Sequence, residues 1–447
     1  MDSGGAPPTL FDIFDPFRPL AADESELYVD WQAQQFREED VKSRLVNAVV
    51  LGAAPTTRLF TGHRGSGKTT ELERVAERLR NGVDTPNGRR RALVVFVRST
   101  EVLELTDLGP EDLIWQIARS LARELDQLGY DDAGAEYRSW FQRVAKGLTG
   151  GIGDTPVQVG DNGLNVTFRL RDFTADRDAF RDQLRREIPT LQRTVNERLL
   201  NTETRRWLKE HHDLDDIVMI VDELDRIPET FDESGTSNYE SIYFRGGWLN
   251  GLACDVILTL PVEFVYSPSA GRLGDVFGQA PLVLPSIAVI NPKTSGPDPA
   301  GLATLWNVVR RRSERAGVDP DRLFDSEDTR RRVLTASGGH PRQLFSFLRA
   351  FMERQPQPPW SGTDVDRWLR REANKFAALP AIEHWPLIDE VARSHQQVNG
   401  EELWNELLRQ RFVLAYHDGT EEWYDANPLL KLATRRRQPL GGEIPKP

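Results

Sequence analysis

The segment Gly62-His63-Arg64-Gly65-Ser66-Gly67-Lys68-Thr69 decides the fold of this 447-residue chain. It satisfies the pattern G-x-x-x-x-G-K-[ST], in which glycines let successive backbone N–H groups point at a phosphate. A helical pattern follows at once, so the positive N-terminal end of a helix adds to the site. Lys68 is expected to reach the β- and γ-phosphates, and the Thr69 hydroxyl is expected to bind Mg²⁺. We therefore predict that the loop, together with the next residue Thr70, binds a nucleotide rather than forming an empty glycine-rich turn.

A second segment complements this loop. The apolar run Ile217–Val221 reads as a buried strand, and it ends in Asp222-Glu223-Leu224-Asp225. Asp222 is placed to hold the hydration shell of Mg²⁺, and Glu223 is placed to orient and activate an attacking water. An apolar strand that ends in an acidic turn is common, but here it follows a phosphate-binding loop. The predicted ligands are ATP and Mg²⁺, and the predicted reaction is hydrolysis of ATP to ADP and phosphate.

The order of patterns along the chain indicates the architecture. Short apolar runs alternate with longer helical patterns, which is typical of an α/β fold with a parallel sheet and helices on both faces. The expected strands include Leu93–Val97, Val256–Leu260 and Leu282–Val289. We assign residues 27–292 to this core, with a β-hairpin inserted at 147–172 around Asp161-Asn162-Gly163. Residues 1–26 are rich in Pro, Gly and Asp and are expected to form an extended N-terminal arm.

Two further units are expected after the core. The pattern is helical over 293–360, which predicts a helical lid. Residues 361–435 then end in a hairpin signal, Phe412–Tyr416 and Trp423–Asp425 on either side of Asp418-Gly419. Helices before a two-stranded ribbon suggest a winged helix, and residues 436–447 remain as a tail.

The lid contains one candidate contact to the nucleotide. Ser337-Gly338-Gly339-His340-Pro341-Arg342 begins a helix. Arg342, in the first turn, could reach the γ-phosphate and so report whether that phosphate is present. The alternative is an ordinary solvated arginine beside a glycine-rich cap, and the residues alone do not choose between the two.

Composition excludes several classes of protein. The chain has 57 Lys and Arg against 69 Asp and Glu, a formal charge of −12, which argues against a dedicated nucleic-acid coat or a polybasic membrane binder. Its one cysteine, Cys254, excludes an internal disulfide framework and a cysteine-based zinc cluster. No apolar run approaches the ~18 residues of a membrane span, and the first residues do not read as a signal peptide. We expect a cytoplasmic protein without a membrane partner.

Together these motifs resemble those of P-loop ATPases of the AAA+ superfamily, near its ORC/Cdc6-like and STAND branches. The resembling region runs from about Leu27 to Leu432. The resemblance identifies residues 62–69 as Walker A and Asp222 and Glu223 as Walker B, and it likens residues 339–342 to the sensor 2 motif. The hairpin insertion is not part of the minimal core of that family. The chain also has neither the effector domain nor the repeat array of large STAND proteins.

The resemblance implies two more site residues. Thr259 sits late in the fourth core strand, where the family has its sensor 1 polar residue. Arg272, within Ser269-Ala270-Gly271-Arg272-Leu273, falls at the position of the arginine finger, with Arg245 as the alternative. An arginine finger completes the site of a neighbouring subunit, so the resemblance implies an oligomer or a partner complex.

The charge of the winged helix bears on DNA binding. Residues 361–435 contain 13 acidic and 9 basic residues, and the expected recognition helix, 401–411, carries Glu401, Glu402 and Glu406. Phosphate contacts would be repelled there. Arg435-Arg436-Arg437 is a local exception. A structural or protein-contacting wing is therefore favoured over a DNA reader.

Three functions remain in competition. The first is a nucleotide-controlled switch or assembly ATPase that controls its own homo-oligomer or a separately encoded effector protein, in bacterial signalling or antiviral defence. The second is an initiator-like DNA-binding ATPase, which the acidic winged helix disfavours. The third is a nucleotide-dependent scaffold without turnover, which Glu223 disfavours. A sugar or nucleotide kinase is less favoured than these, because the Asp222-Glu223 pair suits water as the nucleophile.

Overall fold

The computed structural model describes residues 8–32, 40–103, 108–130, 189–231, 235–244, 247–267, 269–398, 401–418 and 420–434. The hairpin expected at 147–172 and the tail at 436–447 lie outside these residues. Within the described ranges, no helix is long and apolar enough to cross a membrane.

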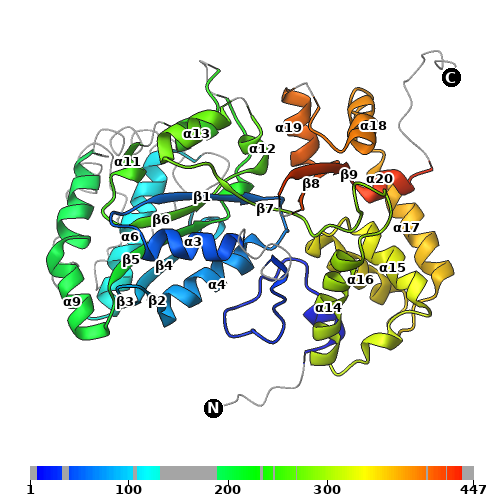
Figure 1. Cartoon of the computed structure of the whole chain (residues 1–447), viewed down its shortest axis with the longest axis horizontal. Helices are drawn as coiled ribbons and strands as arrows, with labels where there is room; N and C mark the ends of the chain where they lie inside the picture. Colours follow the sequence, from blue (N-terminus) through cyan, green and yellow to red (C-terminus); the bar gives the residue numbers. More distant parts are fainter. Residues whose placement is uncertain are drawn as a thin grey trace, which may run out of the picture.

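The centre of the molecule is a five-stranded parallel sheet, as predicted, in the order β4-β5-β6-β1-β7 (Figure 1). The strands are β1 (Thr57–Gly62), β4 (Ala92–Arg98), β5 (Asp216–Asp222), β6 (Asp255–Thr259) and β7 (Leu282–Leu284). Parallel strands end at the same edge of a sheet, and β6 pairs with both β1 and β5. The phosphate-binding loop after β1 and the acidic turn after β5 therefore meet at one edge.

Helices cover both faces of the sheet, because successive strand residues point to opposite faces. Val95 and Met219 belong to one buried cluster, with α6 (Pro110–Gln127), whereas Val94 and Ile220 belong to the other. The second cluster includes residues of α3 (Val41–Val50) and α4 (Lys68–Asn81), which follows the phosphate-binding loop. The other helices of the core are α5 (Ser99–Val102), α9 (Thr202–His212), α10 (Asn238–Tyr243), α11 (Gly247–Asn250), α12 (Val262–Val265) and α13 (Ala270–Phe277). A hairpin of β2 (Val83–Thr85) and β3 (Gly88–Arg90) was not predicted.

The lid and the winged helix follow the core. The lid contains α14 (Pro299–Arg315), α15 (Glu327–Ala336) and α16 (Pro341–Arg354). The predicted winged helix is confirmed, with α18 (His384–Ser394), α19 (Glu401–Arg409), the hairpin of β8 (Val413–His417) and β9 (Glu422–Ala426), and α20 (Pro428–Leu432). Between them lies α17 (Gly362–Phe376), whose Trp368 and Leu369 join the cluster of the lid rather than that of the winged helix.

The N-terminal segment lies between the sheet and the lid (Figure 1). It carries the short helix α1 (Leu10–Ile13), and Phe14, Leu20 and Leu27 are buried. The Phe14 ring lies 5.6 Å from that of Phe345 in α16. The segment expected as an extended arm is thus packed, because its apolar side chains fill the gap between two other parts of the fold.

The last strand is shorter than predicted. The pattern Leu282–Val289 predicts one strand, but β7 ends at Leu284 because Pro285 has no N–H to continue the ladder. The chain then leaves the sheet. The Ser286 N–H donates to the Ala415 carbonyl of β8 at 3.0 Å, and the Ile287 N–H donates to the Gly339 carbonyl at 3.3 Å. This segment therefore ties the sheet to the winged helix and to the lid.

Candidate nucleotide-binding site

Two glycines let other parts of the chain approach the phosphate-binding loop closely. Gly65 has φ 88°, and a Cβ there would lie 2.7 Å from the Cβ of Arg342. A Cβ on Gly62 would lie 2.6 Å from the Leu284 carbonyl oxygen. A larger residue would therefore push the lid or β7 away. The motif serves the packing of the domains as well as the geometry of the loop.

Lys68 is buried in the loop and is satisfied by groups of the protein. Its Nζ donates to the Gly62 carbonyl at 2.6 Å and to the His63 carbonyl at 3.1 Å. It also forms an ion pair with Asp225 Oδ2 at 2.9 Å, and both side chains are buried. Sequence reasoning assigned no role to Asp225. Its place three residues after Asp222, in the turn that follows β5, was the signal available.

Asp222 and Thr69 fit a magnesium site. Asp222 Oδ1 accepts the Glu223 N–H at 2.7 Å, and the Thr69 hydroxyl interacts with the carboxyl group from α4. Asp222 Oδ2 is buried and has no donor in hydrogen-bonding geometry among the described residues. One hydroxyl and one free carboxylate oxygen match Mg²⁺, which takes few protein ligands beside phosphate oxygens and water. The described residues contain no cluster of three or more His, Cys, Asp or Glu that could hold a metal without a substrate.

Burial changes the pKa of the Asp222 carboxyl. It raises the pKa of Asp222 to about 6, and the nearby charge of Asp225 adds to the rise, while Thr69, the Glu223 N–H and Lys68 oppose it. A carboxylate in this position gains from a cation, because a positive charge within a few ångströms favours the ionised form. A cation bound beside Asp222 would therefore lower its pKa again and keep the carboxylate ionised.

Glu223 is held in place from two sides. It has φ 69°, and its Oε1 forms an ion pair with Arg226 at 2.8 Å. Its Oε2 accepts a hydrogen bond from the hydroxyl of Thr100 in α5, which begins directly after β4. Neither Thr100 nor Arg226 was singled out from the sequence. They restrain the carboxylate that is expected to activate water.

Thr259, proposed from the resemblance, lies beneath this turn. Its Oγ1 accepts the Leu224 N–H at 3.0 Å, and its side chain is fully buried. It does not line the cavity described next. Thr259 therefore supports the turn that carries Glu223 from the neighbouring strand β6.

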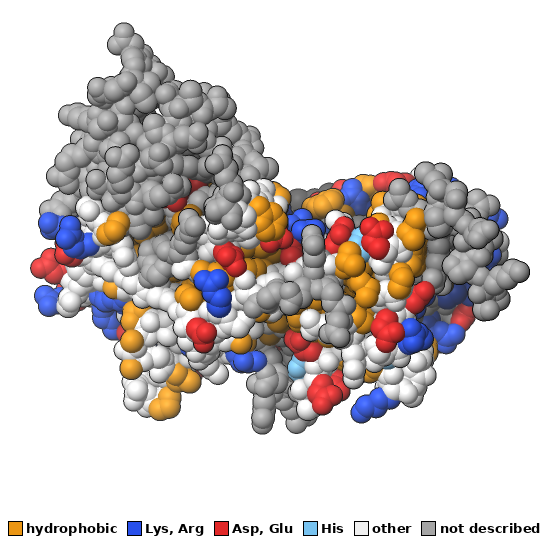
Figure 2. Space-filling model, turned by 90° about the horizontal axis from the view of Figure 1, so that it is seen from above, with side chains coloured by type: hydrophobic (Ala, Val, Ile, Leu, Met, Phe, Trp, Pro, Cys, Tyr) orange, Lys and Arg blue, Asp and Glu red, His pale blue; other side chains and the backbone are white. Residues whose placement is uncertain are grey.

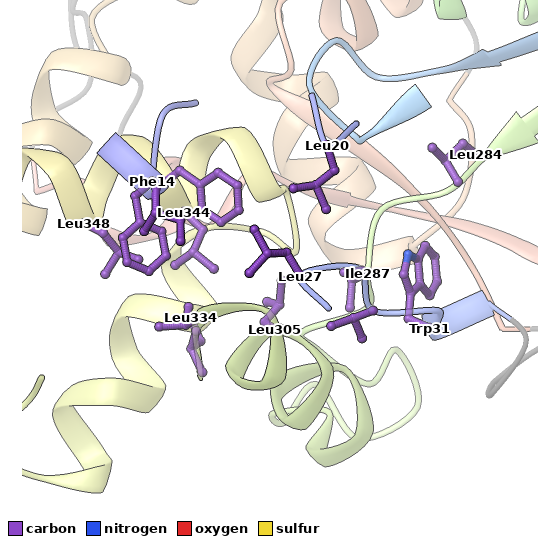
Figure 3. Close-up of a cluster of buried hydrophobic side chains, with 14 of the residues drawn as sticks. Phe14, Leu20, Leu27, Trp31, Leu284, Ile287, Leu305, Leu334, Leu344 and Leu348 are labelled. Atoms are coloured by element: carbon purple, nitrogen blue, oxygen red, sulfur yellow. The ribbon is translucent and has the colours of Figure 1, made fainter. Parts of the chain in front are cut away.

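A cavity of about 270 Å³ lies beside the loop and is lined by Lys68, Thr69, Glu223 and Asp225, but not by Asp222. One part of its wall is the loop Arg64–Thr70 with Glu223 and Asp225. Another part is apolar and comes from the N-terminal segment, the chain after β7 and the lid, including Leu20, Leu27, Ile287, Val308 and Phe345. Figure 3 shows Leu20, Leu27 and Ile287 lying together between these three parts. Cations outnumber carboxylates in the lining, as expected for a site that receives phosphates: Arg18, Arg64, Lys68, Arg98, Arg226, Arg312 and Arg342 line it together with Glu71, Glu223 and Asp225.

Arg342 lines this cavity and is not an ordinary solvated arginine. Its Nε donates to the Pro16 carbonyl at 3.1 Å, and its guanidinium lies 5.4 Å from the centre of the Phe17 ring. Burial lowers the pKa of Arg342, and the charges of Arg226 and Arg411 lower it further. A phosphate would supply the negative charge that this group of arginines lacks.

The winged helix contacts the same loop. His63 Nε2 accepts the Ala415 N–H of β8 at 3.0 Å, and the Tyr416 hydroxyl donates to the Gly338 carbonyl at 2.9 Å. His340 Nε2 lies 2.7 Å from the Arg64 carbonyl, to which it donates because its Nδ1 accepts the Gln343 N–H. The phosphate-binding loop is therefore in contact with the lid and with the winged helix at once.

Arg272, the first of the two arginines proposed as fingers, lies away from this cavity. Arg272, on α13, is 59% exposed, stacks on Phe244 at 4.2 Å and lies 3.6 Å from Glu240. It does not line the cavity of its own chain. Arg245 lies outside the described residues. A role of Arg272 in the site of a neighbouring subunit stays a prediction.

The His63 contact leads to a prediction about acid stability. Burial, with the charges of Lys68 and Arg411, lowers the pKa of His63 to about 3. The unfolded chain takes up this proton at about pH 6.5, so the native state loses stability as the pH falls from 6.5 towards 3. His63→Gln keeps an acceptor for the Ala415 N–H but cannot be protonated. We expect its unfolding free energy to fall less steeply below pH 6.5, by up to about 1.4 kcal/mol per pH unit.

Urea unfolding of the parent and the variant at pH 7.5, 6.5, 5.5 and 4.5 measures this difference. His211→Gln, an exposed histidine at the end of α9, is the matched control and should keep the parental slope. Equal slopes for the parent and His63→Gln would show that His63 is not held neutral.

Comparison with known proteins gives solved structures only. No protein-family model and no curated protein matches the chain. The structure of Drosophila ORC bound to DNA matches at 11% identity over 97% of this chain and 95% of that one, with a TM-score of 0.40. The Aeropyrum pernix ORC2 protein, in ADPNP–ADP complexes, matches at 13% identity over 96% of each chain, with a TM-score of 0.40. Cdc6p from Pyrobaculum aerophilum matches at 11% identity over 92% of this chain and 96% of that one, with a TM-score of 0.36. The solved structures to which this chain is similar thus include ORC and Cdc6 proteins, the branch that its motifs resemble.

Proposed function

We propose that this chain is an ATP-binding and ATP-hydrolysing switch or assembly ATPase. The observation that carries the proposal is the meeting of Lys68 and the restrained Glu223 at one cavity with a phosphate-binding loop. Asp222, with its free Oδ2, lies directly before Glu223 and interacts with Thr69 of that loop. Thr69 and Asp222 would hold Mg²⁺, which neutralises phosphate charge when bound. Lys68 and the loop N–H groups bind the phosphates, and Glu223 orients water for attack.

The ion pair of Lys68 suggests how binding changes the protein. A γ-phosphate would compete with Asp225 for the Lys68 ammonium. The Asp225 carbonyl holds Arg64 Nε at 3.0 Å, and Arg64 in turn accepts the hydrogen bond of His340 from the lid. A change at Lys68 can therefore reach the lid through two contacts. The winged helix is reached through His63, the neighbour of Arg64.

The biological setting is a separate part of the proposal. We propose that the switch controls a homo-oligomer or a separately encoded effector, as in bacterial signalling or antiviral defence. The matched structures reported above are of ORC and Cdc6 proteins, and they lend no support to a role in signalling or defence. The contacts of the winged helix support a switch, because they place the boundary between the core and the winged helix directly at the phosphate-binding loop.

An initiator-like DNA-binding ATPase is the second candidate, and the presence of a winged helix favours it. Its α19, in the position of a recognition helix, packs against α12 of the core. Arg409 lies 3.7 Å from Glu229, and the Tyr266 hydroxyl donates to Glu422 at 3.2 Å. On the face in Figure 2, acidic and basic side chains are interspersed rather than gathered into a basic stripe. DNA binding through α19 would require the winged helix to leave the core.

Lys68→Ala tests the site itself. We expect it to weaken ATP binding at least 100-fold, because it removes a buried cation that would contact two phosphates. Calorimetry with Mg²⁺ and ATP measures the affinity. Lys209→Ala, an exposed lysine on α9, is the control and should bind as the parent does. Parental affinity of Lys68→Ala would overturn the site assignment.

Glu223→Gln tests turnover. The amide keeps the size of the side chain but cannot act as a base, so we expect ATP to bind while phosphate release falls by ~10²–10⁴-fold. Single-turnover phosphate release and nucleotide affinity are measured on the same preparation. Unchanged release would mean that another group activates the water.

The same variant separates the two candidate functions. Trapped with ATP, it can be offered labelled duplex DNA at several salt concentrations. Binding that weakens steeply with salt would favour the initiator-like function, because phosphate contacts release counterions. Binding of a copurified protein without DNA binding would favour the effector-controlling switch.

Arg272→Ala tests whether a neighbour completes the site. An arginine supplied from outside can accelerate phosphoryl transfer by ~10³–10⁵-fold, so the specific ATPase activity of the parent should rise with protein concentration and that of the variant should stay low. Arg331→Ala, which removes an exposed arginine from α15, is the control. If the specific ATPase activity did not change with protein concentration, or if Arg272→Ala were as active as the parent, the assignment of Arg272 would be wrong. Arg245 or a separate partner would then be the next candidate.

A further inference from the structure

Arg312 is a buried, charged residue of the cavity wall. It lies on α14 of the lid, lines the cavity and is only 6% exposed. Burying a guanidinium is costly unless hydrogen bonds or a counter-charge compensate for the lost water. Its surroundings therefore need to be accounted for atom by atom.

The protein satisfies Arg312 only in part. Its Nη1 lies 3.4 Å from the Leu27 carbonyl and 3.3 Å from the Val308 carbonyl, both of which accept. Among the described residues, no carboxylate lies within ion-pair distance, and no hydrogen bond is formed by Nε or Nη2. The guanidinium stacks on the Phe345 ring, 4.6 Å from its centre. Burial lowers the pKa of Arg312 to about 10 although the charge of Glu24 opposes the shift, so Arg312 is still charged at neutral pH.

The position of Arg312 within the cavity identifies the part of a nucleotide that it would meet. The phosphates belong to the loop that ends at Thr70, and the Leu20 N–H donates to Thr70 Oγ1 at 3.2 Å. Leu20 therefore marks where the polar wall gives way to the apolar one, which Leu27 and Ile287 continue (Figure 3). A planar apolar base fits this wall, and Arg312 reaches it from α14, through the Leu27 carbonyl.

We propose that Arg312 binds the base of the nucleotide, with its guanidinium stacked on the ring or donating to its ring nitrogens. The inference rests on the proposed function, since it assigns one wall of the same site. A planar guanidinium can stack on two rings at once, so Phe345 on one face leaves the other for the base. The Nε and Nη2 donors match the acceptor nitrogens of a purine.

The competing explanation is that Arg312 only clasps the lid to the N-terminal segment. The preceding residue gives a matched control for that role. Arg311 Nη1 donates to the Tyr28 carbonyl at 2.7 Å and to the Glu26 carbonyl at 3.2 Å, but Arg311 does not line the cavity. A clasp would predict similar effects of removing either arginine. A contact to the base predicts an effect of Arg312 alone, and only on ligands that contain a base.

The experiment compares two ligands on three proteins. Affinities for ATP and for inorganic tripolyphosphate, which lacks the base, are measured with Mg²⁺ for the parent, Arg312→Met and Arg311→Met. We expect Arg312→Met to weaken ATP binding by roughly 10-fold or more, as loss of a stacking contact does, and to change tripolyphosphate binding less than about 2-fold. Arg311→Met should change neither affinity by more than about 2-fold. Arg312→Lys keeps the charge without the planar group and is used if Arg312→Met does not fold; it should also bind ATP more weakly.

Each outcome has one meaning. Unchanged ATP affinity, equal weakening of both ligands, or the same losses in Arg311→Met would overturn the assignment of Arg312, while the proposed function would stand. A parent protein that binds neither ligand would overturn the proposed function and the inference with it.

Discussion

The main chain of the phosphate-binding loop is the constraint on which the rest of the structure depends. Its N–H groups must stay open for phosphate, so the neighbouring parts of the fold attach through its carbonyls and side chains. Lys68 takes two of the carbonyls, and His340 takes a third. β7 and the lid approach this loop closely because two of its positions are glycine, and the winged helix contacts it through His63. A small loop therefore fixes the relative positions of three units.

The second constraint is a group of positive charges that nearby carboxylates compensate only in part, as Glu223 does for Arg226. Arg64, Arg226, Arg342 and Arg411 face the loop region, and burial and mutual repulsion lower the pKa of Arg342 and Arg411. Arg411 belongs to the winged helix and Arg342 to the lid, so the repulsion acts across domain boundaries. A triphosphate would relieve this repulsion and would stabilise the observed arrangement of the domains by an amount that grows with its concentration relative to its Kd. The charges that would attract a triphosphate thus belong to different domains, so a bound triphosphate would strengthen the contact between them.

The sequence predicts the local parts of the site better than the distant ones. The phosphate-binding loop and the acidic turn after β5 follow from spacing, because each is a contiguous pattern with one geometry. The pair Lys68–Asp225 and the contact His63–Ala415 join residues far apart in the chain, and no local pattern marks them. The contact between Thr100 and Glu223 was not predicted for the same reason. The predicted strand 282–289 is longer than β7 because the prediction followed the apolar pattern past Pro285. Proline has no N–H with which to continue the ladder.

The docked winged helix links these constraints to function. The Ala415 N–H of β8 donates to His63 and the Tyr416 hydroxyl donates to the lid turn, while α19 packs against α12 of the core. The face of α19 that packs against α12 cannot contact another macromolecule at the same time. Any partner that binds through α19, whether protein or nucleic acid, must compete with the contacts that the wing makes to the phosphate-binding loop. A nucleotide that altered the contacts between His63 and β8 would therefore also alter the availability of that face of α19, and linkage would make the effect reciprocal.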